Sequence, residues 1–106
     1  MTYMPHTLTR LLWATALAFI LTCCQHGSPS ESETQSIRDS LATLRQQGKK
    51  ERDASRYDEA LRLHIRGLDI ARAVGDSSEW IQALNNIATD YRRMGMLDVA
   101  QSYHYQ

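Results

Sequence analysis

Apolar residues of the chain beyond residue 36 recur at helical spacing. They fall three or four positions apart in two segments, so each set lies on one face of a helix. The first set is Ile37, Leu41 and Leu44, and the second is Trp80, Leu84, Ile87, Tyr91 and Met94. A further stripe between them holds Ala60, His64, Gly67, Leu68 and Ala71, and no proline follows Pro29. The pattern predicts an all-α fold.

Glycines and one capping sequence separate these stripes. Gly75 and Gly95 each follow a helical segment, where a left-handed residue ends a helix. Asp76 and Glu79 have the spacing of a capping box at the start of the next helix. The sequence therefore predicts helices over residues 36–54, 57–74, 78–94 and from 97 to the end.

The helical region repeats itself with a period of forty residues. The matched pairs are Leu44 with Leu84, Gly48 with Ala88, Tyr57 with Leu97, Asp58 with Asp98, Ala60 with Ala100, and His64 with His104. Self-similarity at a fixed period is typical of repeat architectures. We expect one repeat over residues 36–76 and a second, incomplete one over 77–106.

The repeated positions resemble a tetratricopeptide repeat, in which a large apolar residue is followed by Leu-Gly, then Tyr, then small residues in the second helix. The second copy matches with Leu84, Ile87, Ala88, Tyr91, Gly95, Leu97 and Ala100. The first copy keeps Leu44, Gly48, Tyr57, Ala60 and Gly67, but has Gln47 and Glu51 where Leu and Tyr are usual. A period of forty residues also suits HEAT or armadillo repeats, since tetratricopeptide repeats usually have about 34.

The nine-residue step from Gly48 to Tyr57, repeated from Ala88 to Leu97, favours the tetratricopeptide type. The resemblance implies an α-solenoid of antiparallel helical hairpins that binds a protein or peptide. Small residues where the helices of a hairpin cross let the axes approach to about 8–10 Å. The expected packing residues are Leu44, Gly48, Tyr57, Ala60, Leu84, Ala88, Tyr91 and Ala100.

The N-terminal segment differs from the rest. Residues from Leu11 to Thr22 form an uncharged run of twelve, too short to span a bilayer and typical of the apolar core of a signal peptide. We interpret residues 1–23 as a signal peptide, the alternative being a buried amphipathic helix. The polar, Ser-rich residues 24–35 then predict a flexible tether.

The sequence from Leu21 to Gln25 resembles the lipobox of bacterial lipoproteins, in which a cysteine is lipidated after cleavage just before it. Lipidation of Cys24 places Cys23, close to Ser in size, at the position that is usually small; lipidation of Cys23 places the bulkier Thr22 there. The resemblance implies a lipid-anchored protein of the bacterial cell envelope, with Cys24 favoured over Cys23. Simple secretion without an anchor is the alternative.

Composition excludes several classes of function. The 12 basic and 12 acidic residues balance, which is unlike a domain that coats nucleic acid. Two adjacent cysteines support neither a disulfide framework nor a zinc site. No catalytic constellation or cofactor motif is visible, so we expect no enzyme, metal or cofactor. His64 and His104 form a conceivable metal pair, but packing at an aromatic position is the favoured interpretation.

Basic residues are concentrated between Arg45 and Arg56. One interpretation is a solvated helix face with pairs such as Lys49 with Asp53. The resemblance implies another, a groove lined by the first helix of each repeat and suited to an acidic partner. Its residues would be Arg45, Lys49, Arg52, Gln82, Asn85, Thr89 and Arg92.

The second repeat is expected to leave an apolar face open at Leu97, Ala100 and Tyr103. Either a longer protein continues beyond Gln106, or this face pairs with another chain, including a second copy. We expect a protein-interaction module of the cell envelope. The alternative is the input fragment of a truncated sensor kinase or transcriptional regulator.

Overall fold

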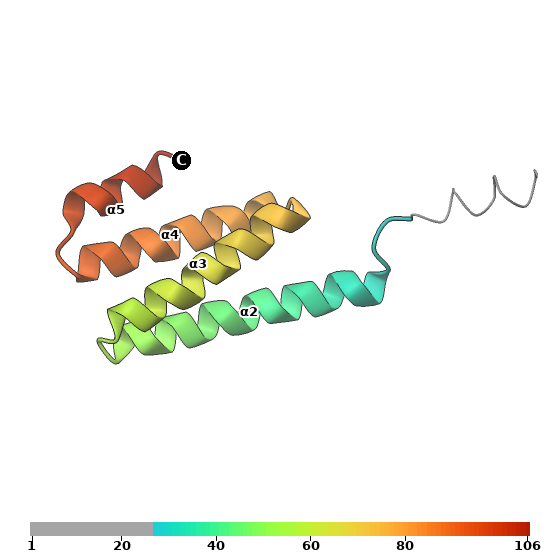
Figure 1. The fold of residues 1–106 in the computed structure, drawn as a ribbon, viewed down its shortest axis with the longest axis horizontal. Coiled ribbons are helices and arrows are strands. Elements are labelled where there is room, and N and C mark those ends of the chain that lie inside the picture. The colour runs from blue at the N-terminus through green and yellow to red at the C-terminus, as the bar shows by residue number, and fades with distance from the viewer. Residues whose placement is uncertain (1–26) are drawn as a thin grey trace, which may run out of the picture. The chain divides into compact units, whose positions relative to one another are not determined.

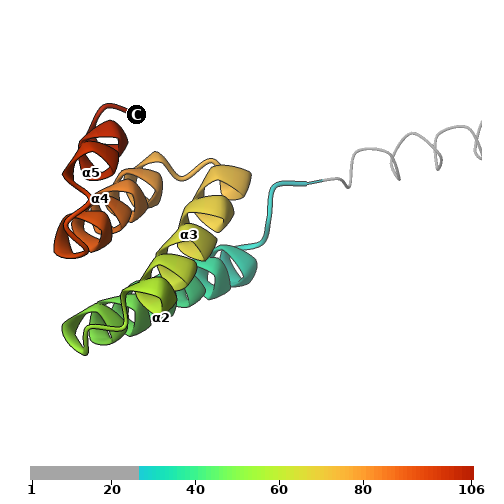
Figure 2. The same ribbon diagram turned by 60° about the vertical axis from the view of Figure 1, so that its left-hand side comes forward.

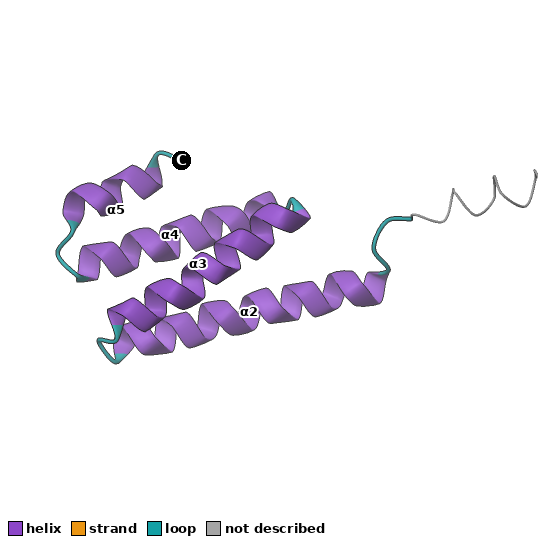
Figure 3. Ribbon diagram, viewed as in Figure 1, coloured by secondary structure: helices purple, strands orange, loops and turns teal. Residues whose placement is uncertain are grey.

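The computed structural model describes residues 27–106, and all of their regular structure is helical (Figure 3). Four helices follow one another in this part of the chain: α2 (Glu31–Asp53), α3 (Tyr57–Val74), α4 (Ser77–Arg93) and α5 (Leu97–His104). They belong to one compact unit, Glu31–Gln106. The expected signal peptide, its apolar run, Cys23 and Cys24 lie outside the described residues.

Consecutive helices run antiparallel and pack side by side, α2 on α3, α3 on α4 and α4 on α5 (Figure 1). The helix α2 also contacts α4, so the first helices of the two hairpins are neighbours. Figure 2 shows α2 and α5 on opposite sides of this stack. The expected antiparallel hairpins of a helical repeat protein are therefore confirmed.

Three turns of the same design connect the helices. The left-handed residues Ser55, Gly75 and Gly95, with φ of 62°, 71° and 80°, stand twenty positions apart. After each of them the next N–H returns to a carbonyl five residues earlier, as in the bond of 3.0 Å from Asp76 to Ala71. The predicted stops at Gly75 and Gly95 are confirmed, and each forty-residue repeat consists of two half-repeats of twenty.

The predicted start of the first helix was wrong by five residues. The helix α2 begins at Glu31, so residues 31–35 are helical and do not belong to a tether. The physical reason is visible in the sequence. Ser30 and Glu33 have the spacing of a capping box, and the acidic Glu31 and Glu33 lie in the first turn, where the helix dipole favours negative charge.

The capping box predicted at α4 forms only in part. The Asp76 side chain accepts a hydrogen bond of 3.0 Å from the Glu79 backbone N–H, as expected. The Glu79 carboxylate, however, pairs with Arg45 of α2, and the Asp76 N–H bonds to Ala71. The Glu79 carboxylate therefore joins α4 to α2 instead of completing the capping box.

The core lies between the helices, where small and large apolar residues alternate. Leu61, Leu68, Ala83, Leu84 and Ile87 form its centre, with Trp80, Tyr91 and Tyr103 packed against it. The predicted packing residues Leu44, Gly48, Ala60, Leu84, Ala88 and Ala100 are buried, and Tyr57 and Tyr91 are half-buried. The helices therefore pack closely where these small residues lie.

The face expected to be open on α5 is largely covered. Leu97 is exposed, but Ala100 is buried, and the Tyr103 ring stacks on Tyr91 of α4 with centroids 5.6 Å apart. The helix α5 uses this face to pack on α4, so Ala100 and Tyr103 do not form an open surface. None of the helices in residues 27–106 combines the length and the hydrophobicity that a membrane span requires.

Candidate functional site

Two arginines of α2 reach across to α4. Arg45 Nη1 lies 2.7 Å from Glu79 Oε2, at a half-exposed position. Arg52 Nη1 lies 3.0 Å from Asp90 Oδ1, and the Arg52 side chain is only 10% exposed. Arg52 also donates a long hydrogen bond, 3.4 Å, to the backbone carbonyl of Asn86. Both ion pairs join the first helix of one hairpin to the first helix of the next.

Asp90 is the centre of this contact. Its side chain is fully buried, Oδ1 accepts from Arg52 of α2, and Oδ2 accepts from Nδ1 of His64 on α3. Because a carboxylate only accepts hydrogen bonds, the Nδ1 nitrogen carries the hydrogen. A buried carboxylate without partners would cost several kcal/mol, and the bonds from Arg52 and His64 offset the burial of Asp90.

Gly48 makes room for His64. A Cβ built on Gly48 would lie 2.3 Å from Nε2 of the imidazole, so only glycine lets the ring pass at this crossing. His64 is 2% exposed, and its Nε2 makes no hydrogen bond within residues 27–106. The favoured interpretation of His64 as a packing residue is confirmed, although it also bonds a carboxylate.

His104 does not repeat this arrangement. It is exposed near the end of α5, whereas His64 is buried, so the packing expected of His104 was wrong. The residue of α4 that corresponds to Gly48 is Ala88, which carries a methyl group where Gly48 has only a hydrogen atom. The described residues contain no group of three or more metal-ligating side chains.

The cavity between α2, α3 and α4 is too small for a substrate. It measures about 20 Å³ and is lined by Leu41, Arg45, Leu63, His64, Gly67, Glu79, Gln82, Ala83 and Asn86. A space of this size holds one water molecule. The surface formed by α2 and α4 is therefore the stronger candidate for function.

A model of the tetratricopeptide repeat family matches residues 39–106. The chain belongs to the tetratricopeptide repeat family. No match was found among curated proteins or among solved structures. In this family pairs of antiparallel helices stack into a scaffold for protein–protein interaction, and such repeats are typically not catalytic. Here α2 is the first helix of the first tetratricopeptide repeat, and α4 is the first helix of the second.

The predicted groove of this tetratricopeptide repeat protein is only partly available. The Arg52 side chain is largely covered and paired with Asp90, so little of it reaches the free surface where it was expected; Arg45 is half-exposed but paired with Glu79. Both arginines meet a carboxylate of α4, so their charge is neutralised within the fold. Sequence reasoning missed Glu79 and Asp90 as their partners.

The remaining groove residues of the tetratricopeptide helices are accessible. Lys49, Gln82, Asn85 and Arg92 are exposed, and Thr89 is half-buried with its hydroxyl donating 2.9 Å to the Asn85 carbonyl. Lys49 stands between Arg45 and Arg52 along α2, at the level where α2 meets α4. Binding by these residues stays a prediction.

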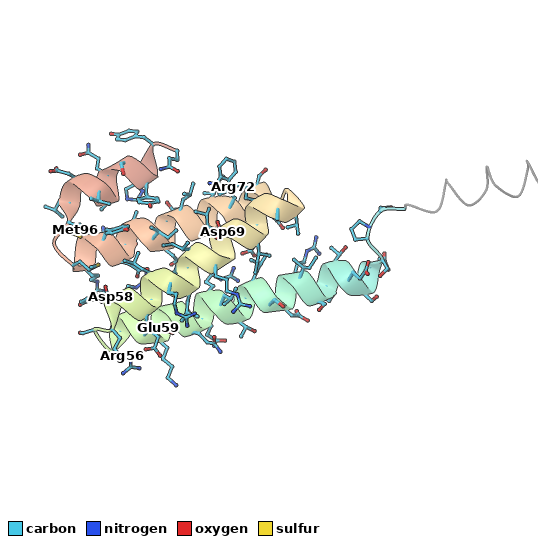
Figure 4. The ribbon with its side chains drawn as sticks, viewed as in Figure 1. Arg56, Asp58, Glu59, Asp69, Arg72 and Met96 are labelled. Atoms are coloured by element: carbon cyan, nitrogen blue, oxygen red, sulfur yellow. The ribbon has the colours of Figure 1, made fainter. Side chains whose placement is uncertain are left out.

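Exposed ion pairs cover the end of the molecule where α2 turns into α3. Glu51 pairs with Arg56, and Glu59 pairs with Arg62; Arg56 and Glu59 are labelled in Figure 4. The hydrogen bond from Arg56 lowers the pKa of Glu51, and the one from Arg62 lowers the pKa of Glu59. These charges cancel locally, so this end offers no strong field to a ligand.

Proposed function

We propose that this tetratricopeptide repeat protein holds an acidic segment of a protein partner on the exposed face of α2 and α4. The observation that carries the proposal is the exposure of Lys49 on α2 and of Arg92 on α4, together with the exposed amide side chains of Gln82 and Asn85 on α4. Cations and amides supply the donors that carboxylates need. Arg45 and Arg52 contribute by holding α4 against α2.

The test compares two charge reversals on α2. Lys49→Glu places a negative charge on the proposed surface. Lys50→Glu makes the same change one residue away, which turns it about a quarter of a helical turn from that surface. Both side chains are exposed, so neither substitution disturbs the core.

Proteins captured by the full chain and by each variant would be identified by mass spectrometry, and the affinity of the main acidic partner would be measured. Lys49→Glu is expected to weaken binding about tenfold and Lys50→Glu much less, with the difference shrinking at high salt. Equal binding by both variants would contradict the proposed surface.

We also propose that the protein is exported and anchored in the bacterial envelope by a lipid on Cys24. The support is the uncharged run from Leu11 to Thr22, followed directly by Cys23 and Cys24. Expression of the full chain with labelled palmitate would test this. Cys24→Ser should lose the label and Cys23→Ser should keep it; an unlabelled native chain would contradict anchoring.

A further inference from the structure

The contact between α2 and α4 supplies a template for a second contact on α4. Leu41 and Arg52 of α2 are covered by α3 and α4 together: Leu41 is 3% exposed, and the Arg52 side chain is 10% exposed. Leu41 lines the same small cavity as Ala83, and Arg52 pairs with Asp90. Ala83 and Asp90 stand seven residues apart, which places them on one face of α4, two turns from each other.

The same two residue types recur on α4 forty positions later. Ile81 corresponds to Leu41, and Arg92 corresponds to Arg52. Both are uncovered: Ile81 is 58% exposed, and Arg92 is exposed with no ion pair among the described residues. Ile81 and Arg92 therefore repeat the α2 half of the contact between α2 and α4. The other half of that contact consists of Ala83 and Asp90.

We propose that Ile81 and Arg92 dock an amphipathic helix of a partner protein, which lies on α4 as α4 lies on α2. The docked helix runs parallel to α4. It places a small apolar residue against Ile81 and, seven residues later, an aspartate against Arg92. This site shares Arg92 with the acidic-segment surface of the proposed function but goes beyond it, because it recognises a helix through an apolar contact at Ile81 and one carboxylate at Arg92.

A second copy of this chain does not fit the site. On α2 the residues that correspond to Ala83 and Asp90 are Thr43 and Lys50. Head-to-tail stacking of two copies would therefore bring Lys50 towards Arg92, and like charges in contact oppose association. The aspartate that Arg92 lacks must come from a different helix.

His64 has no counterpart at this site. Ala88 replaces Gly48, and His104 is exposed near the end of α5, so the second carboxylate partner is missing. The docked aspartate would be held by Arg92 without a histidine. We therefore expect a weaker contact than the one inside the fold, suited to reversible binding.

The probe for the test is a peptide with the sequence of α4, Ser77–Arg93, which carries Ala83 and Asp90 in the required register. It would be labelled and titrated with the full chain, and binding would be followed by fluorescence anisotropy. A peptide with Asp90→Asn is the matched control. The peptide is expected to bind about tenfold more tightly than its control, since charge-assisted pairs are roughly twice as strong as neutral ones.

Variants of the chain locate the contact. Arg92→Gln should remove the preference for the aspartate peptide, and Ile81→Ser should weaken both peptides equally, whereas Lys49→Gln should change neither. Arg92→Asp should in turn prefer a peptide with Asp90→Arg. Equal binding of the two peptides, a preference that survives Arg92→Gln, or no binding at about 1 mM peptide would overturn the proposal. Arg92 belongs to both surfaces, but Lys49 belongs only to the acidic-segment surface, so Lys49→Gln separates the two proposals. Weaker binding of both peptides by Lys49→Gln would also overturn the proposal.

Discussion

The backbone of Gly48 lies directly against the imidazole of His64: a methyl group on Gly48 would come within 2.3 Å of Nε2. The ring is held in place by the hydrogen bond between its Nδ1 and the buried Asp90, which a shift away from Gly48 would strain. The two helices of the first hairpin, α2 and α3, therefore meet at a point where one hydrogen atom, in place of a methyl group, determines the fit.

Gly48→Ala should lower the free energy of unfolding by about 1–3 kcal/mol, the usual cost of overpacking, despite the better helix propensity of alanine. Gly67→Ala is the matched control, since a Cβ on Gly67 meets nothing within 4 Å. That variant should gain about 0.5–1 kcal/mol. Urea unfolding measures both, and the same sign of change for both would contradict the crossing described here.

Ser55 is a non-glycine residue in the left-handed region, with a φ of 62°. The matching residues of the other two turns are Gly75 and Gly95. Ser55→Gly should raise the free energy of unfolding by about 1 kcal/mol, because a side chain is strained there. Gly75→Ser should lower it by a similar amount. Thermal unfolding would show both shifts, and a destabilised Ser55→Gly variant would contradict the shared turn design.

Ala88 is fully buried on the face of α4 where α5 crosses. Ala88→Leu should cost about 1–3 kcal/mol, since the added carbons have no space. Ala73→Leu on the exposed face of α3 makes the same chemical change without crowding. A melting temperature of Ala88→Leu equal to that of Ala73→Leu would show that the helices do not approach closely at this point.

Burial raises the pKa of Tyr91, and the neighbouring Tyr103 raises it further. The folded chain then holds its proton to higher pH than the unfolded chain, whose tyrosine titrates near 10. The stabilising effect is complete below pH 10 and is lost as pH rises through the folded pKa. Above pH 10 the free energy of unfolding in urea should therefore fall more for the native chain than for Tyr91→Phe. A difference between the two that does not change with pH would contradict a raised pKa of Tyr91.

Much of the fold could be predicted from the sequence, because its signals are local or periodic. Gly75 and Gly95 marked two turns through the conformation that glycine allows, and the forty-residue period brought out Gly48 and Ala88 as crossing points. The turn at Ser55 carries no such signal, since serine rarely takes a positive φ. The start of α2 was missed because its first residues are polar, and a helical segment that buries few side chains shows no apolar periodicity.

The candidate site was harder to predict, since ion pairs between helices depend on their relative position. Arg45 and Arg52 looked like surface charges, and only the packing of α2 on α4 brings them to Glu79 and Asp90. One signal was available: Asp90 continues the stripe of Ala83 and Ile87 at helical spacing. A charged residue on an apolar stripe requires partners from neighbouring helices.

The central claim is that Asp90 of α4 is locked between Arg52 of α2 and His64 of α3, which joins the two hairpins. A double-mutant cycle of Arg52→Gln and Asp90→Asn in urea tests it most directly. Each single change should cost about 3–5 kcal/mol, and the double change should cost clearly less than their sum, with a coupling of about 2–3 kcal/mol. The half-exposed pair Arg45 with Glu79 should show less than about 1 kcal/mol in the same cycle. Additive costs for Arg52 and Asp90 would contradict the claim.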